Sequence, residues 1–193
     1  MIVAYLLIAV FVVLDVWLGV KLVEYIYCAF IRHQPPFVAA NKKMRRAVAD
    51  EILANYRNIK TVCEIGSGHG NLARYIARHC KVRVFALENM PFSVFVSKLF
   101  GMFGPWRCKT VWSDAFDWLD NNKEPVDIAV AYLGPRVMLR LKAYAVKFDV
   151  LISLDFEVPG LKPVRTIDVC PGHTVYAGKK YPHRLYVYEL GRR

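Results

Sequence analysis

A group of closely spaced glycines beside an acidic residue is the first part of this sequence that could do chemistry. A short apolar run contains Glu64, and it continues as Ile65-Gly66-Ser67-Gly68-His69-Gly70 directly before a segment with helical periodicity. Glycines at such a place let the backbone turn tightly and approach a ligand closely. The helix N-terminus behind them favours an anionic group such as a carboxylate. We therefore expect ligand contacts from Glu64, Gly66, Ser67, Gly68 and Gly70.

The spacing of these glycines argues against two common cofactors. They form G-x-G-x-G, whereas the dinucleotide-binding pattern G-x-G-x-x-G would need its third glycine at Asn71. This disfavours a nicotinamide or flavin dinucleotide. A glycine loop alone can also be a purely structural turn. The residues at the neighbouring strand ends distinguish a ligand-binding loop from such a turn.

Two further acidic residues stand where the next two strands are expected to end. Glu88 lies 24 residues after Glu64, where it could accept hydrogen bonds from both hydroxyls of a ribose. Asp114 could accept an adenine amino hydrogen while the ring of Phe116 lies against the base. Ligands in sheets of this kind bind at the carboxyl ends of the strands, so the three acids together predict a nucleoside-containing cofactor. The predicted contacts in these two turns are Glu88, Asn89, Asp114, Ala115 and Phe116.

The elements that would position these residues alternate between strand and helix. Apolar runs predict strands at 61–65, 82–87, 108–112, 126–132 and 148–154. Helical periodicity predicts helices from the capping residue Asn41 to about Tyr56, and at 71–79, 92–102 and 135–145. This alternation is typical of an α/β fold with a Rossmann-like, doubly wound and mostly parallel sheet.

The C-terminal part has a different pattern. Beyond Pro159 the helical periodicity is lost, and Tyr176 and the run 185–188 predict closing strands. We expect these strands to form an antiparallel hairpin at the edge of the sheet. The length of 193 residues suits one such domain with a full hydrophobic core.

The N-terminal segment predicts one transmembrane helix. Between Ile2 and Val20 there are 13 Ile, Leu, Val and Phe residues, which favour insertion by a total of roughly 4–8 kcal/mol. Asp15 opposes insertion by about 2.5–3.5 kcal/mol, so insertion wins. A cleaved signal peptide fits poorly, because no basic segment precedes the apolar run and no small-residue cleavage site follows it. The alternative is a helix that packs on the domain as part of its core.

The flanking charges predict the orientation of this helix. Arg32, Lys42, Lys43, Arg45 and Arg46 all follow the apolar run, and no Lys or Arg precedes it. The positive-inside rule then places the domain on the cytoplasmic side, or on the matrix side of a mitochondrial membrane. We expect residues 1–31 to form a single-pass anchor and residues 32–193 to form the domain. Asp15 could contact a partner within the membrane or simply be tolerated near the interface.

The net charge and the residue spacing indicate which classes of binding partner to expect. The chain carries 27 Lys and Arg against 16 Asp and Glu, and residues 32–193 carry 26 against 14. Anionic lipid headgroups attract such a domain by about 1 kcal/mol per nearby cation. Nucleic acid is the rival explanation, but the sequence has no known nucleic-acid-binding signature. We expect an anionic membrane surface as partner, no nucleic acid, and no metal, since the five cysteines and five histidines lack ligand-like spacing.

Together these motifs resemble the class I S-adenosylmethionine-dependent methyltransferases. More narrowly, the chain from Pro35 to about Leu190 resembles the membrane-anchored lysine N-methyltransferases that modify the ATP synthase c subunit and the adenine nucleotide translocase, a family that has prokaryotic members. The resemblance rests on Pro36-Phe37-Val38, the glycine loop, Glu88-Asn89-Met90-Pro91, Tyr132-Leu133-Gly134-Pro135, Val150-Leu151-Ile152-Ser153, Val158-Pro159 and Lys162-Pro163. The chain departs from the family's usual residues at Ala39, Ala40, His69 and Asn71, and by an extra glycine after Leu133.

The resemblance implies methylation of a lysine in a membrane-associated protein, with S-adenosylmethionine as cofactor. It makes Tyr132 the residue that orients the amine, beside its predicted cofactor contact, and Phe37 a residue that closes the pocket. Core packing is the alternative role for both. Two other functions stay open: methylation of a phospholipid amine or small molecule, and a membrane-tethered protein that binds S-adenosylmethionine, or assists assembly, without turnover.

Overall fold

The computed structural model describes residues 2–26 and 38–191. The chain divides into two compact units, Met1–Val38 and Ala39–Arg193. The predicted boundary between residues 31 and 32 falls outside the described residues and stays a prediction. Phe37, the predicted pocket residue, also lies outside them.

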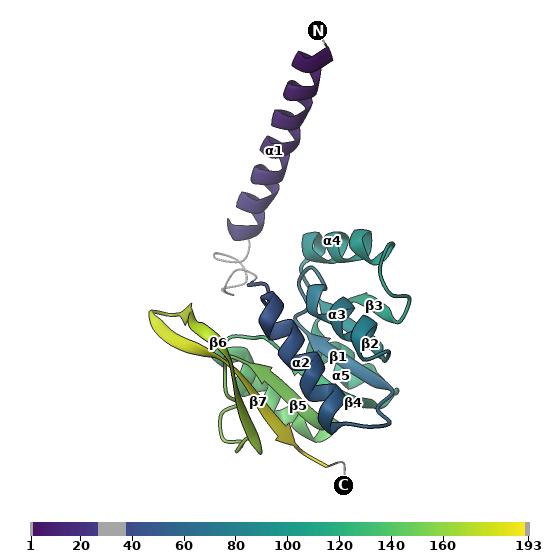
Figure 1. Ribbon diagram of the computed structural model, residues 1–193, viewed down its shortest axis with the longest axis vertical. Helices are drawn as coiled ribbons and strands as arrows, with labels where there is room; N and C mark the ends of the chain where they lie inside the picture. Colours follow the sequence, from purple (N-terminus) through teal and green to yellow (C-terminus); the bar gives the residue numbers. More distant parts are fainter. Residues whose placement is uncertain (1, 27–37, 192–193) are drawn as a thin grey trace. The chain divides into compact units, whose positions relative to one another are not determined.

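The first unit contains one long apolar helix, α1 (Ile2–Ile26) (Figure 1). Its apolar side chains are spread around all sides of the helix, without the polar stripe of a surface helix. The segment Ile2–Val20 is long and apolar enough to cross a membrane. A signal sequence or the core helix of a soluble protein has the same length and composition, so the helix alone does not assign a membrane role.

The second unit is built on a seven-stranded sheet with the order β3-β2-β1-β4-β5-β7-β6 (Figure 1). Strands β1 to β5 are parallel, and β7 pairs antiparallel with both β5 and β6. The order changes direction between β1 and β4, which is where ligands bind in doubly wound sheets. The strands are β1 (Thr61–Ile65), β2 (Arg83–Glu88), β3 (Cys108–Trp112), β4 (Val126–Ala131), β5 (Phe148–Leu154), β6 (Arg165–Tyr176) and β7 (Lys179–Glu189).

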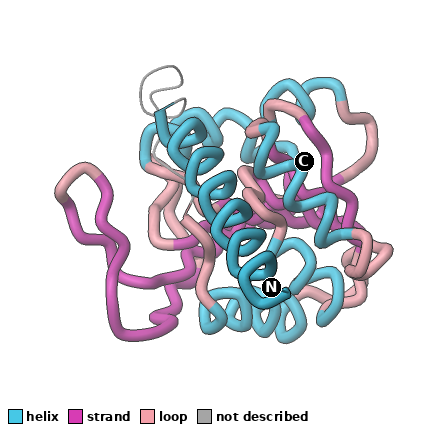
Figure 2. The backbone as a smooth tube through the Cα atoms, turned by 90° about the horizontal axis from the view of Figure 1, so that it is seen from above, coloured by secondary structure: helices cyan, strands magenta, loops and turns pink. Residues whose placement is uncertain are grey.

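Helices cover both faces of this sheet (Figure 2). One core cluster, which includes Ile76, joins α2 and α3 to the first face, and a second, which includes Leu119, joins α5 and α6 to the opposite face. Helix α4 lies on the α3 side, where Ser97 Oγ is 2.8 Å from Thr110 Oγ1 of β3. The helices are α2 (Lys42–Asn55), α3 (Asn71–His79), α4 (Pro91–Gly101), α5 (Ala115–Asn121), α6 (Pro135–Leu141) and the 3₁₀ helix η2 (Lys142–Lys147).

The predicted α/β fold with its parallel sheet and C-terminal antiparallel strands is confirmed. The five predicted strands and the helices α2, α3 and α4 match their predicted ranges to within one residue. Helix α2 starts where expected because the Asn41 side chain accepts a hydrogen bond from the Met44 N–H at 3.0 Å. The predicted helix 135–145 is instead α6 followed by η2. Helix α5 was not predicted, because its seven residues are too few to show a clear period.

Candidate functional site

The glycine loop connects β1 to α3 at the carboxyl end of the parallel strands. Gly66, Gly68 and Gly70 have φ angles of 71°, 53° and 72°, in the left-handed region that favours glycine. The Ser67 N–H donates to the Leu87 carbonyl at 2.9 Å, and the Gly70 N–H donates to the Ser67 carbonyl at 2.8 Å. These bonds hold the loop against the end of β2.

Close packing adds a second reason for glycine in this loop. A Cβ atom at Gly66 would lie 2.6 Å from Leu133 Cδ2, in the turn after β4. A Cβ atom at Gly70 would lie 2.8 Å from Arg74 Nη1 and would overlap with Ser97 Oγ of α4. The loop is therefore enclosed by the turn after β4 on one side and by α4 on the other.

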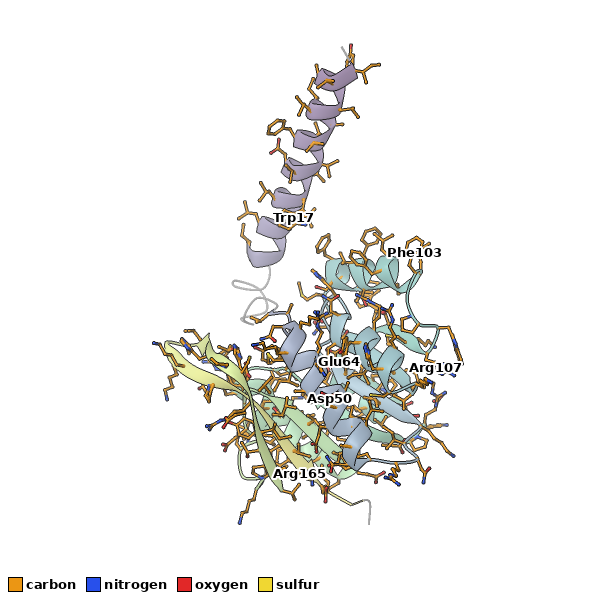
Figure 3. All side chains as sticks on the ribbon, in the orientation of Figure 1. Trp17, Asp50, Glu64, Phe103, Arg107 and Arg165 are labelled. Carbon is orange, nitrogen blue, oxygen red and sulfur yellow. The ribbon has the colours of Figure 1, made fainter. Side chains whose placement is uncertain are left out.

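Two buried carboxyl groups face this loop. Glu64 Oε2 accepts a hydrogen bond from the Ala73 N–H in the first turn of α3 at 2.7 Å. Glu88 Oε2 accepts from the Gly68 N–H at 2.7 Å, and its Oε1 accepts from the next two backbone N–H groups at 2.9 and 2.8 Å. Figure 3 shows Glu64 in the interior of the domain, and the two residues are only 5% and 8% exposed. The structure thus brings Glu64, Gly68 and Glu88 to one place, as the sequence predicted.

The electrostatics of this place favour a ligand with positive charge or hydroxyl donors. Burial raises the pKa of Glu64 to about 8; the Ala73 N–H opposes this shift, and the charge of Glu88 adds to it. Ser67 Oγ is buried and has no hydrogen-bond partner within residues 2–26 and 38–191. An unsatisfied buried hydroxyl costs roughly 1–3 kcal/mol, which a bound ligand can recover.

The end of β3 carries the two residues that were predicted to contact an adenine base, Asp114 and Phe116. Asp114 Oδ1 caps α5 by accepting hydrogen bonds from the Phe116 N–H at 2.9 Å and the Asp117 N–H at 3.4 Å. The Phe116 ring is buried, with the Tyr144 ring centroid at 5.0 Å and the Arg140 guanidinium carbon 4.0 Å above it. The predicted contact between this ring and an adenine base stays untested, and the burial of the ring disfavours it.

A second polar cluster lies at the ends of β4 and β5. Tyr132, directly after β4, donates a hydrogen bond from its hydroxyl to Asp155 Oδ2 at 2.8 Å. Thr174 of β6 donates to the same oxygen at 2.7 Å and lies 2.7 Å from the Tyr132 hydroxyl. Burial raises the pKa of Tyr132, and the Asp155 carboxylate adds to this shift, so the phenol keeps its proton.

Asp155 also holds His183 of β7. His183 Nδ1 lies 3.1 Å from Asp155 Oδ2, and the Arg184 N–H donates to Asp155 Oδ1 at 3.2 Å. Asp155 is fully buried and has a φ of 61°, so several neighbours fix an unusual backbone conformation. A Cβ atom at Gly172 would lie 3.3 Å from His183 Nε2, so the glycine leaves space beside that nitrogen.

This cluster was not predicted from the sequence. Only Tyr132 was predicted to act there, and His183 was considered only as a metal ligand. One signal was present: Asp155 directly follows the predicted strand 148–154, so it stands at a strand end like Glu88 and Asp114. Within the described part of the chain, no group of three or more His, Cys, Asp or Glu residues could hold a metal ion.

The chain is similar in structure to several solved methyltransferases. The chain is similar to an RNA methyltransferase from Salinibacter ruber in complex with S-adenosyl-L-homocysteine, with 18% identity, a TM-score of 0.61, and coverage of 81% of this chain and 95% of that one. It is similar to a putative O-methyltransferase from Klebsiella pneumoniae, with 13% identity, a TM-score of 0.58, and coverage of 88% and 96%. It is also similar to a precorrin-6y C5,15-methyltransferase from Geobacter metallireducens, with 12% identity, a TM-score of 0.57, and coverage of 80% and 91%.

These likenesses show that the chain has the fold of the class I methyltransferases. No family model matches the chain, and no curated protein matches it in sequence. The narrower resemblance to lysine methyltransferases therefore rests on the motifs of the sequence alone. The product of S-adenosylmethionine, seen in the Salinibacter ruber structure, agrees with the predicted cofactor.

Proposed function

We propose that this chain is an S-adenosylmethionine-dependent N-methyltransferase whose substrate is a lysine of a membrane-associated protein. The observation that carries the cofactor assignment is the arrangement of Glu64 and Glu88 around three left-handed glycines, in a fold whose solved examples include methyltransferases. The substrate assignment is supported by the sequence motifs, the apolar helix α1 and the basic charge.

The residues present fit the cofactor. Its ribose carries two hydroxyl donors, and Glu88 is the buried acceptor at the end of β2. Its amino-acid end carries a carboxylate and an ammonium group, which suit the N-terminus of α3 and the Glu64 carboxyl respectively. The Ser67 hydroxyl supplies one more polar group that has no partner among the described residues.

The polar cluster at Asp155 is the proposed substrate side of the site. When bound, S-adenosylmethionine supplies a methyl group on a positively charged sulfur, which a neutral amine can take by direct displacement. Tyr132 stands at the switch point between β4 and β1, and its protonated hydroxyl and its ring can orient that amine. Its hydrogen bond to Asp155 and its contact with the Thr174 hydroxyl fix the position of the ring.

A lysine amine must lose a proton before it reacts, and His183 is the group we assign to take it up. His183 Nδ1 faces the Asp155 carboxylate, so the ring proton lies on Nδ1 and Nε2 keeps its lone pair. Nε2 is then the ring nitrogen that can accept the proton of the amine. The roles are then distinct: Tyr132 positions the amine, His183 accepts the proton, and Asp155 holds both side chains.

The test uses the full-length protein in detergent with methyl-labelled S-adenosylmethionine. Membranes from a source that lacks the gene serve as substrate, and label is counted in protein, lipid and RNA fractions. Glu88→Ala is the inactive variant. Asp50→Ala is the matched control, because it removes an exposed carboxylate on α2 whose ion pair with Arg46, at 3.4 Å, is itself on the surface.

The fractions separate the candidate functions. A labelled protein band that is lost with Glu88→Ala and kept with Asp50→Ala supports the proposal, and peptide mapping then identifies the lysine. Label in the lipid fraction would assign a phospholipid amine instead. Label in RNA would contradict the prediction of no nucleic-acid partner and would match the Salinibacter ruber neighbour. Saturable cofactor binding without any label would indicate a binding protein without turnover.

A further inference from the structure

Helix α4 buries small side chains and exposes large apolar ones. Its buried residues are Ser93, Val94 and Ser97, and Ser97 packs against Thr110 of β3. An ordinary surface helix places its apolar stripe against the core. Here Phe95, Leu99 and Phe100 of the helix are exposed, and so are the large apolar residues of the loop that follows it. We define the α4 apolar surface as Phe95, Leu99, Phe100, Met102, Phe103 and Trp106, all of them exposed.

The exposure of this surface is unusually high for such side chains. Phe103 is 85% exposed, Trp106 82% and Met102 74%. Figure 3 shows Phe103 on the outer side of α4, directed away from the domain. No member of the α4 apolar surface belongs to either core cluster in the described part of the chain. Exposed apolar patches of this kind mark contacts with a partner or a membrane.

Only positive charge accompanies the α4 apolar surface in the sequence. From Met90 to Ser113 the chain contains no Asp or Glu, and it contains Lys98, Arg107 and Lys109. A neutral or acidic rim would have suited many protein partners. A stretch of chain that carries cations and no acids suits an anionic surface.

Two arginines lie directly on the aromatic rings. The guanidinium carbon of Arg107 is 4.3 Å from the Trp106 ring centroid, and that of Arg74 is 5.7 Å from the Phe100 ring centroid. Trp and Phe beside Arg and Lys are typical of segments that lie at the level of lipid headgroups, with the rings among the upper acyl chains.

We propose that the α4 apolar surface inserts into the interfacial layer of a bilayer that contains anionic lipids. The inference takes the membrane anchoring in the proposed function as its premise, and it adds a second contact, made by the domain itself. A second copy of the chain fits less well, because self-association would bring the same cations face to face. Helix α4 starts three residues after Glu88, so docking would also restrain the turn that holds the predicted ribose acceptor.

The test reads the fluorescence of Trp106 in the full-length protein reconstituted into vesicles. The chain has four tryptophans, so Trp17→Phe removes the one in α1 and serves as the background. The difference between this background and Trp17→Phe/Trp106→Phe isolates the emission of Trp106. Vesicles contain one third phosphatidylglycerol, with or without bromine on the acyl chains, and bromine quenches tryptophan only where the two are in contact.

We expect brominated chains to lower the Trp106 emission at least twofold, and aqueous iodide to leave it nearly unchanged. Adding Phe100→Ser and Phe103→Ser should abolish the bromine effect. Leu139→Ser is the matched control, because it removes an exposed apolar side chain from α6, on the opposite face of the sheet. Vesicles of phosphatidylcholine alone should give weaker quenching, and equal quenching would overturn the role given to the cations.

Two results would overturn the docking itself. Quenching of Trp106 by iodide and not by bromine would place the surface in water. Protection from both quenchers would place it against protein, either a second copy or another partner. Insertion of α1 is measured separately, by resistance of the protein to extraction with alkaline carbonate. Because neither readout needs turnover, failure of this inference is distinguishable from failure of the proposed methyl transfer.

Discussion

Replacing Glu88 with alanine tests the cofactor site most directly. The Glu88 carboxylate has two roles: it accepts hydrogen bonds from the backbone, and it is predicted to bind the cofactor. It accepts hydrogen bonds from the Gly68 N–H of the glycine loop and from the N–H groups of Asn89 and Met90. It is also the predicted acceptor for the ribose hydroxyls. The variant should therefore bind the cofactor more weakly and fold less stably, for different reasons.

The two effects have different expected sizes. Loss of the ribose hydrogen bonds to a charged acceptor should weaken cofactor binding by about 2–3 kcal/mol. This corresponds to an increase in Kd of about 30- to 150-fold, at 1.4 kcal/mol per factor of ten. The bond from the Gly68 N–H is buried, and its loss should lower the free energy of unfolding by a further 1–3 kcal/mol or so. The other two N–H groups are partly exposed, so water can replace their acceptor.

Glu88→Gln separates the effect on cofactor affinity from the effect on stability. Its amide has the shape of the carboxylate, but it places an NH₂ donor opposite either the Gly68 N–H or the Asn89 N–H. We expect a smaller loss of affinity than with alanine and a similar loss of stability.

Calorimetric titration of the detergent-solubilised protein with S-adenosylmethionine gives the Kd, and thermal unfolding gives the stability. Asp50→Ala, which removes an exposed carboxylate, should change neither. If folded Glu88→Ala bound the cofactor with a Kd within threefold of the native value, the assignment of the ribose site would be refuted.

Three further substitutions test the rest of the site. The pKa of Glu64 is about 8 in the folded chain against the usual 4.5, so between these pH values the folded chain holds a proton that the unfolded chain has released. The free energy of unfolding should therefore fall as pH rises from 4.5 to 8, by up to about 1.4 kcal/mol per pH unit. Denaturant unfolding of Glu64→Gln should show no such pH dependence. Gly66→Ala should lose about 1–3 kcal/mol of stability because its φ is 71°, and adding Leu133→Ala should relieve the steric contact without restoring stability fully, as thermal unfolding would show. His183→Asn should lower kcat by about 10²–10⁴-fold and leave the cofactor Kd unchanged; an unaltered pH profile of kcat would remove His183 from the mechanism.

The elements of this fold could be predicted because their signals are local. The buried strands β1 and β4 are short apolar runs, and helices α2 and α3 have regular apolar spacing, so their ranges follow from neighbours in the sequence. Helix α5 has seven residues and no such signal. The residues at its start were predicted to form a ligand-binding turn, and the structure shows that Asp114 of this turn also caps the helix.

The two parts of the candidate site differ in how far the local sequence predicts them. The glycine loop and Glu88 could be found because each lies at the end of a recognisable strand, and the parallel register of β1 and β2 brings them together. The cluster around Asp155 depends on residues 174 and 183, which reach it only through the pairing of β5, β6 and β7. The register of β6 and β7 is shifted near Cys170 and His173, and no alternation in the sequence predicts such irregularities.

Helix α4 shows a further limit of periodicity. The sequence predicted its range to within one residue, but a period indicates only that like residues share a side, not which side faces the core. In α4 the serines face the sheet because small side chains let the helix approach β3 closely enough for Ser97 Oγ to lie 2.8 Å from Thr110 Oγ1. That approach turns Phe95, Leu99 and Phe100 outward, toward whatever surrounds the domain. An apolar stripe is thus evidence for a contact, and only the packing of the opposite side tells whether the contact is the protein's own core.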